Sequence, residues 1–284
     1  MSASVRDIEL TLGEPSHDRV IRGSVHDPAE AALGTILFCH GFKGFKDWGP
    51  WPHFASRLAA RGWRVLRFNF SYCGVGPAGD RFDEPERFAV NTYGRELEDL
   101  NVVVARREEW DPNPEAPLGL IGHSRGGLVG LLFASEETSI EAAVTLGAPG
   151  RSFRFDDRAR AEWRERGYHP IVNQRTGETL RLELSVLDDF EANSERYDVS
   201  RALARRSCPT LVIHGTEDST VPPVEAEWIH EAVTAPRELV LIEGAGHTFN
   251  ARHPFEEGSA PLLDVACDRA ELWFRLQFRL QLRT

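Results

Sequence analysis

The chain alternates short apolar runs with segments of helical periodicity, after an opening of a different kind. Residues 4–12 and 19–27 alternate apolar and polar positions, as half-exposed antiparallel strands do, and they predict an entry hairpin. Residues 34–40 then form a continuous apolar run, 50–62 have helical spacing ended by glycine, and 63–70 are strand-like again. This strand-helix-strand order predicts that the sheet becomes parallel.

The same alternation continues over most of the remaining chain. Further strands are predicted over 117–123, 140–149, 209–215 and 237–246. Between and after them, helical spacing covers 92–108, 124–137, 222–233 and part of 261–280. Buried strands joined by helices build doubly wound sheets, so we predict an α/β fold with a mostly parallel sheet covered on both faces.

Residues 151–207 interrupt this rhythm. The segment is strongly charged and holds two helical stretches and a predicted hairpin that turns at 175–177. Because a charged block between two core strands cannot lie inside the sheet, we expect a cap inserted over one end of it. The core then consists of residues 1–150 and 208–284. A surface insertion without a function is the alternative.

Charge and composition narrow the classes of function. The 284 residues include 44 Asp or Glu and 33 Lys or Arg, which gives a net charge of -11. Such an acidic chain argues against nucleic-acid binding, which needs clustered basic residues, and against a membrane surface. The N-terminus has no pattern of a secretion signal and no long apolar run follows, so we expect a cytoplasmic protein. The oligomeric state stays open, and a homo-oligomer is compatible with the sequence.

The four cysteines lie far apart and lack the spacing of metal ligands. We therefore expect neither a zinc site nor a disulfide framework, but four buried free thiols. These residues are Cys39, Cys73, Cys208 and Cys267.

A serine stands between a predicted buried strand and a predicted helix in the stretch Gly-His-Ser-Arg-Gly-Gly. This is the context that a G-x-S-x-G nucleophile motif requires. Gly122 and Gly126 permit a turn too tight for side chains at both flanking positions, and the turn would present the hydroxyl of Ser124. The alternative is a serine that only happens to lie in a tight turn.

A nucleophilic serine needs a base and an acid that orients the base. His247 follows the last predicted strand on a glycine-flanked loop, and His253 is a rival base. Asp218 follows the strand 209–215 at its carboxyl end, the edge at which open α/β sheets gather their sites. Its neighbour Glu217 is the rival acid, and capping of the next helix is the structural alternative for Asp218.

Two backbone donors are expected for the oxyanion that forms when a serine attacks a carbonyl group. One is the N–H of Arg125, at the start of the helix that follows the serine, where the helix dipole also favours negative charge. The other is the N–H of Phe42 in His-Gly-Phe-Lys-Gly, directly after a predicted strand. This glycine-rich segment has a flexible turn as its alternative reading.

The stretches HGFKG, GHSRGG, HGTEDSTVP and GAGHTF occur in this order, and with them nearly the whole chain resembles the α/β-hydrolase superfamily. It is similar in particular to bacterial esterases of the dienelactone-hydrolase-like and cinnamoyl or feruloyl esterase groups. Dienelactone hydrolases proper have a cysteine nucleophile, which is absent here, and the charged insertion matches feruloyl esterase lids in place and size without a shared motif. The resemblance implies that Ser124 is the nucleophile, His247 the general base and Asp218 the acid that orients it. It also implies that Phe42 and Arg125 are the two oxyanion donors.

The implied reaction is two-step acyl transfer on a small-molecule carboxylic ester, without a metal or an organic cofactor. Four aromatic residues of the predicted cap are expected to line the substrate pocket, with a small core of the cap as their alternative role: Trp163, Tyr168, Phe190 and Tyr197. Aromatic lining would suit an aryl or hydroxycinnamoyl ester.

Three other classes of protein are alternatives to an esterase. A serine peptidase of the prolyl-oligopeptidase type uses the same residues, but too few residues precede position 34 for its propeller. Haloalkane and epoxide hydrolases need an acidic nucleophile where this chain has Ser124. A non-catalytic hydrolase-like binding protein commonly lacks a member of the triad, whereas all candidates are present here.

Overall fold

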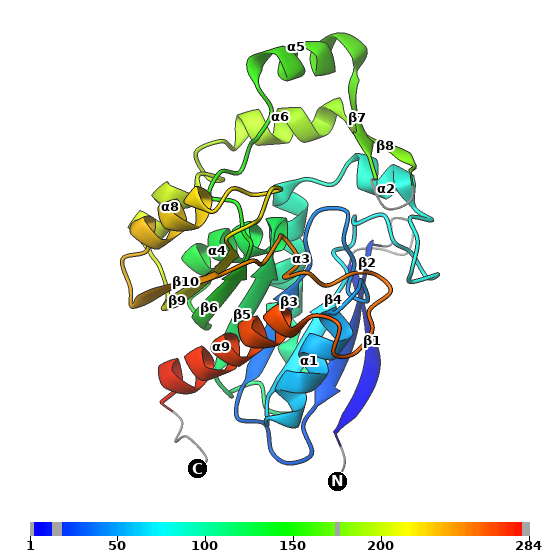
Figure 1. Ribbon diagram of the computed structural model, residues 1–284. Coiled ribbons are helices and arrows are strands. Elements are labelled where there is room, and N and C mark those ends of the chain that lie inside the picture. The colour runs from blue at the N-terminus through cyan, green and yellow to red at the C-terminus, as the bar shows by residue number, and fades with distance from the viewer. Residues whose placement is uncertain (1–2, 13–18, 174–176, 280–284) are drawn as a thin grey trace.

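An eight-stranded mixed sheet runs through the centre of the computed structural model, which describes residues 3–12, 19–173 and 177–279 (Figure 1). The strand order across the sheet is β1, β2, β4, β3, β5, β6, β9, β10. Their bounds, in the same order, are Ser4–Leu12, Arg19–Asp27, Arg64–Phe68, Thr35–Cys39, Leu118–His123, Ile140–Leu146, Thr210–Gly215 and Arg237–Ile242.

The sheet changes from antiparallel to parallel along this order. β1 pairs antiparallel with β2, which pairs antiparallel with β4, and every pairing from β4 to β10 is parallel. The predicted entry hairpin and the mostly parallel α/β sheet are therefore confirmed. In such a sheet the carboxyl ends of the parallel strands meet at one edge, which is where a site is expected.

Helices cover both faces of the sheet (Figure 1). α1 (Trp51–Ala60) and α9 (Pro261–Gln277) lie on one face. The other face carries α3 (Tyr93–Ala105), α4 (Arg125–Glu136) and α8 (Val224–Ala232), and a 3-10 turn at Arg107–Glu109 follows α3. Two clusters of buried side chains, one on each face, form the core.

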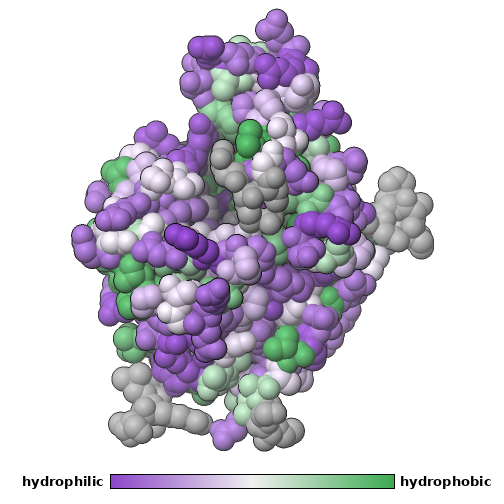
Figure 2. Space-filling view, turned by 45° about the vertical axis from the view of Figure 1, so that its right-hand side comes forward, coloured by the Kyte–Doolittle hydropathy of each residue, from purple (hydrophilic) through white to green (hydrophobic). Residues whose placement is uncertain are grey.

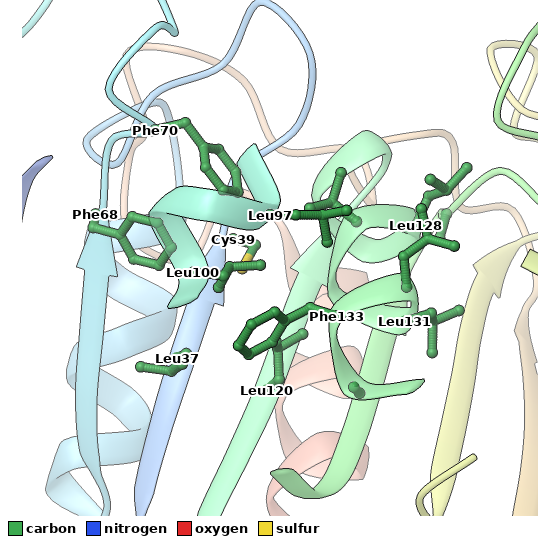
Figure 3. Close-up of a cluster of buried hydrophobic side chains, with 14 of the residues drawn as sticks. Leu37, Cys39, Phe68, Phe70, Leu97, Leu100, Leu120, Leu128, Leu131 and Phe133 are labelled. Atoms are coloured by element: carbon green, nitrogen blue, oxygen red, sulfur yellow. The ribbon is translucent and has the colours of Figure 1, made fainter. Parts of the chain in front are cut away.

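Figure 3 shows part of the cluster under α3 and α4. Leu97 and Leu100 of α3 and Phe133 of α4 point toward apolar side chains of the strands, and all three are at most 1% exposed. Full burial of one such side chain stabilises a fold by ~1.5–3 kcal/mol. This packing holds the amino end of α4 in place at the end of β5.

The segment after β6 rises above the carboxyl edge of the sheet (Figure 1). It contains α5 (Asp157–Arg166), the antiparallel pair β7 (Tyr168–Val172) and β8 (Thr179–Glu183), and α6 (Leu184–Ala192). The side chain of Asp156 caps α5 by accepting from the N–H of Ala159 at 2.8 Å, and Gly167 ends the helix with a φ of 82°. Of the turn predicted at 175–177, residues 175 and 176 lie outside the described residues.

Two helices were not predicted from the sequence. α7 (Val199–Arg205) contacts α4 and α8, so the end of the predicted cap segment packs on the helical layer of the core. α2 (Pro85–Ala89) contacts β8.

All four cysteines are buried and free, as expected. Among the described residues, no helix combines the length and apolarity that crossing a bilayer requires.

Candidate active site

Ser124 lies at the sharp turn between β5 and α4. Its φ of 52° and ψ of -125° put it in a region of backbone conformation that non-glycine residues rarely occupy. The N–H of Ser124 donates to the carbonyl of Leu146 at the end of β6, at 2.9 Å. A strained residue held by a strand end is typical of a functional position.

Both flanking glycines are required by close backbone contacts. A Cβ on Gly122 would lie 2.3 Å from the carbonyl oxygen of Gly126, and a Cβ on Gly126 would lie 2.4 Å from the carbonyl oxygens of Cys39 and His40. No side chain fits at such distances. The turn predicted from Gly122 and Gly126 is confirmed, together with its steric reason.

His247 and Asp218 form a hydrogen-bonded pair at the same edge of the sheet. Nδ1 of His247 lies 2.7 Å from Oδ2 of Asp218, whose side chain is fully buried. The other oxygen, Oδ1, accepts from the backbone N–H groups of Thr220 and Val221, both at 2.9 Å. The carboxylate is thereby held in one orientation and points at the imidazole.

The alternatives for the acid Asp218 and for the base His247 are not supported by this geometry. α8 begins at Val224 with Pro223 as its N-cap, so Asp218 does not cap that helix. Glu217 is exposed, whereas its neighbour Asp218 is buried. His253 accepts from the N–H of Gly49 through Nδ1 at 2.8 Å, and among the described residues it does not line the site.

A second imidazole, that of His214, also contacts the carboxylate of Asp218. Nε2 of His214, a fully buried residue at the end of β9, lies 2.9 Å from the carbonyl oxygen of Val221 and 3.3 Å from Oδ2 of Asp218. Burial by itself raises the pKa of Asp218, but the hydrogen bonds with His214 and His247 outweigh it and hold that pKa well below its usual range. Asp218 therefore stays ionised at neutral pH.

His123, the residue before Ser124, also lines the site. Its Nε2 lies 3.0 Å from the carbonyl oxygen of His247, and its ring lies between the rings of Trp51 and His247, with centroids 4.7 and 4.8 Å away. Because a carbonyl only accepts, Nε2 carries the proton. Burial, with a smaller contribution from His247, lowers the pKa of His123 to about 3. The neutral ring positions the loop that carries His247.

The loop after β3 is held by His40. Nδ1 of His40 donates to the carbonyl of Gly41 at 2.9 Å, and Nε2 accepts from the N–H of Phe70 at 3.3 Å. The N–H of Gly44 closes a tight turn on the carbonyl of Gly41 at 3.0 Å. This turn places Phe42 beside the amino end of α4, and both Phe42 and Arg125 line the same cavity as Ser124.

A cavity of about 540 Å³ lies between the strand ends and the segment above them. Ser124 and His247 contribute to its floor. Trp163 and Phe190 come from the segment above the floor, residues 151–198, which we call the upper segment, as predicted. Prediction from the sequence missed two further aromatic residues that the upper segment contributes, Phe153 and Phe155, and three from the core, Trp48, Trp51 and Tyr93. The rings of Phe153 and Phe190 stack with centroids 4.2 Å apart.

The expectation that Tyr168 and Tyr197 line the pocket is wrong. Tyr168 lies at the start of β7 with its side chain toward solvent, where the guanidinium of Arg166 packs on it. Tyr197 is buried, and its hydroxyl donates to the carboxylate of Asp189 at 3.0 Å. Neither is among the described residues that line the cavity. Tyr197 instead joins the upper segment to α3, where its hydroxyl lies near Gly94.

Two curated relatives match parts of the chain. The non-reducing polyketide synthase mapC' of Penicillium brevicompactum is 34% identical over 83 residues, which are 27% of this chain and 4% of the synthase. The uncharacterized protein YfhR of Salmonella typhi is 27% identical over 232 residues, which are 79% of this chain and 68% of that protein. The chain thus spans a small fraction of the synthase and about two thirds of YfhR.

Solved structures share the fold over nearly the whole chain. The esterase domain of a Rhodothermus marinus protein is 20% identical, with a TM-score of 0.65 over 96% of this chain and 98% of that chain. Est1E from Butyrivibrio proteoclasticus is 16% identical, with a TM-score of 0.67 over 95% and 99% of the two chains. A family model described as alpha/beta hydrolase family matches residues 36–260, and the chain belongs to that family.

Proposed function

We propose that this protein is a serine hydrolase of carboxylic esters in which Ser124 is the nucleophile, His247 the general base and Asp218 the orienting acid. The observation that carries the proposal is the 2.7 Å contact between Nδ1 of His247 and the buried carboxylate of Asp218, in the cavity that Ser124 lines from a strained turn. An acid, a base and a serine are the three members of a catalytic triad.

The proposed reaction has two steps. His247 takes the proton of Ser124 through Nε2 while the hydroxyl oxygen attacks the ester carbonyl, and it then returns the proton to the departing alcohol. A water molecule repeats the cycle on the acyl-enzyme. Asp218 keeps Nδ1 protonated and stabilises the imidazolium, and its low pKa suits this role because the carboxylate remains charged.

The oxyanion is proposed to bind the backbone N–H groups of Phe42 and Arg125. Arg125 is the first residue of α4, whose opening N–H groups have no partner within the helix and lie at the positive end of its dipole. The loss of one oxyanion donor typically costs ~3 kcal/mol of transition-state stabilisation, so two donors are worth a substantial part of the rate enhancement.

The segment 151–207 is proposed to act as a lid over this site, with residues 1–150 and 208–284 as the hydrolase core. The aromatic side chains above the floor favour an aryl or hydroxycinnamoyl ester: Phe153, Phe155, Trp163 and Phe190. A structure of Est1E, whose fold this chain shares, is described as binding ferulic acid, a hydroxycinnamic acid. The substrate proposal rests on the aromatic lining, and the likeness to Est1E agrees with it.

Labelling with a fluorophosphonate, followed by intact-mass measurement, tests the nucleophile. We expect one adduct on the wild type and none on Ser124→Ala, and an unlabelled wild type would contradict the proposal. A panel of short-chain, aryl and hydroxycinnamoyl esters beside peptidyl amides then tests the substrate. Faster turnover of the amides would favour a peptidase, and no turnover of any of them would favour a binding protein.

A further inference from the structure

We propose that the ester hydrolysed here carries a carboxylate and that the side chain of Arg125 binds it. This inference rests on the proposed hydrolase function and adds the substrate's charge to it. The backbone of Arg125 and its side chain then have separate tasks, since the N–H serves the oxyanion and the guanidinium selects the substrate.

The charge of the cavity is opposite to the charge of the protein. The chain as a whole has a net charge of -11. Among the described residues that line the cavity there are four basic side chains, Lys43, Arg125, Arg151 and Arg154, and no Asp or Glu. Walls of low polarity strengthen the field of such charges and raise the local concentration of an anionic substrate.

Arg125 holds a fixed position beside Ser124. Its Nε donates to Oε2 of the buried Glu96 at 2.9 Å, and its Cζ lies 4.2 Å from the ring centroid of Tyr93 and 5.4 Å from that of Phe42. Oε1 of Glu96 accepts from Asn91 at 2.7 Å, so Glu96 is itself held in place. The guanidinium therefore meets a ligand without first having to be ordered.

One nitrogen of this guanidinium has no partner in the part of the chain that the structure describes. Nη2 of Arg125 is buried and makes no hydrogen bond to any described residue. A buried donor left unsatisfied costs ~1–3 kcal/mol, and the cost is larger for a charged group. A carboxylate oxygen at this position would satisfy the donor with a charge-assisted hydrogen bond.

The other basic residues raise the potential but are already engaged. Nζ of Lys43 donates to the carbonyl of Val172 at 3.1 Å, and Arg154 donates to the carbonyl of Thr220 at 2.9 Å. The guanidinium of Arg151 packs on the ring of Trp228, 4.2 Å from its centroid. Glu96 balances the charge of Arg125, and Glu225, 3.5 Å from Arg154, balances the charge of Arg154. Lys43 and Arg151 therefore supply the net positive charge that favours a carboxylate over a neutral acceptor.

A second buried donor without a partner among the described residues belongs to the upper segment. Nε1 of Trp163, a residue that is 1% exposed, makes no hydrogen bond within the described chain. It belongs to α5, so a polar group bound to Arg125 on the floor and one bound to Trp163 above would fix a substrate at both ends. The indole hydrogen bond is neutral, whereas the bond to Arg125 is charge-assisted, so Arg125 is the residue to test.

Matched pairs of esters test the proposal. On the acyl side, the pair is 4-nitrophenyl hydrogen adipate against 4-nitrophenyl hexanoate, and on the alcohol side 3-carboxyphenyl butyrate against phenyl butyrate. After subtraction of the uncatalysed rates, we expect at least one carboxylated ester to have a kcat/KM at least about tenfold above its neutral partner. The pair that shows the preference identifies the side of the ester that faces Arg125.

The variant Arg125→Gln should lower that ratio about tenfold or more, whatever happens to either rate alone, and Arg125→Lys should restore part of it because the charge is kept. Arg158→Gln is the matched control. The side chain of Arg158 is 87% exposed on α5 and pairs with Glu162. This variant therefore removes the same charge away from the cavity and should leave the ratio unchanged.

Arg125→Gln leaves the buried Glu96 without its ion pair. The double variant Glu96→Gln with Arg125→Gln removes both charges and keeps the test valid if the single variant fails to fold. Neutral esters preferred in both pairs, or a ratio that Arg125→Gln does not change, would overturn this inference alone. If neither ester class is turned over and Ser124 is not labelled, the hydrolase proposal fails as well.

Discussion

The floor of the site and the segment above it are built under different physical demands. The floor consists of backbone turns at the ends of β3, β5 and β9, where an added Cβ on Gly122 would meet a carbonyl oxygen at 2.3 Å. The upper segment, residues 151–198, is charged and largely exposed, and its outer surface is predominantly hydrophilic (Figure 2). The turn that carries the proposed nucleophile thus has no room for an added Cβ, whereas much of the upper segment faces solvent.

The forces that hold the two regions differ accordingly. On the floor, Asp218 is fully buried and accepts hydrogen bonds from two backbone N–H groups. Above it, ion pairs such as Arg158 with Glu162 are solvent-exposed. Exposed pairs stabilise a fold by only ~0–1 kcal/mol each. The comparison teaches that substitutions on the floor should cost more than substitutions in the upper segment, and four sets of variants test this.

The largest effect is expected for Asp218→Asn on the floor. Asparagine keeps the shape but favours the wrong tautomer of His247, so kcat should fall by about 10⁴-fold. Ester hydrolysis followed at saturating substrate checks this, with Glu217→Gln as the matched control because Glu217 is exposed. Equal activity of the two variants would mean that Asp218 is not the orienting acid.

Two glycine substitutions compare the regions directly. Gly122→Ala forces a Cβ against the carbonyl of Gly126, so we expect it to destabilise the fold by ~3 kcal/mol or more. Gly167→Ala at the end of α5 meets no atom within 4 Å, and its φ of 82° should cost only ~1 kcal/mol. Urea unfolding of both variants provides the measurement. Similar losses would contradict the stated difference between floor and upper segment.

The third effect is a loss of folding stability at acidic pH. Burial lowers the pKa of His40 to about 4, so between pH 6.5 and 4 the unfolded chain binds a proton that the folded protein does not. The stability that the neutral His40 contributes is therefore fully present above pH 6.5 and is lost as the pH falls toward 4. From pH 7.5 to pH 5 this residue should account for ~2 kcal/mol of the loss.

Unfolding of His40→Asn at both pH values isolates this contribution, since the variant should lose less stability than the wild type on acidification. The matched control is His169→Asn in the upper segment, where burial lowers the pKa of a half-buried imidazole. We expect its pH dependence to stay close to that of the wild type. A larger change for His169→Asn than for His40→Asn would reverse the comparison.

The smallest effect is expected for Phe190→Ala, which removes one ring of the stacked pair with Phe153. An aryl ester that contacts these rings should lose about tenfold in kcat/KM relative to ethyl acetate, since an aromatic contact is worth ~0.5–1.5 kcal/mol beyond the buried area. Steady-state kinetics with both esters gives the ratio. An unchanged ratio would remove the upper segment from substrate selection.

The sequence by itself determined the strand order along the chain and the turn at Ser124. Both depend on local patterns: apolar runs predict buried strands, and Gly122 and Gly126 allow a strand-to-helix turn whatever surrounds it. His247 and Asp218 could be selected because each follows a predicted strand, and carboxyl ends of parallel strands share one edge. α2 and α7 were missed because they are short and lack a strong apolar period.

Only the tertiary structure decided how side chains meet within the site. The contact of His123 with the carbonyl of His247 joins residues 124 positions apart, and that of Asp218 with His247 spans 29. The unpartnered Nη2 of Arg125, and the turning of Tyr168 away from the cavity, likewise depend on which surfaces pack together. Local patterns specify backbone and order, whereas the direction of a side chain is set by neighbours that are distant in sequence.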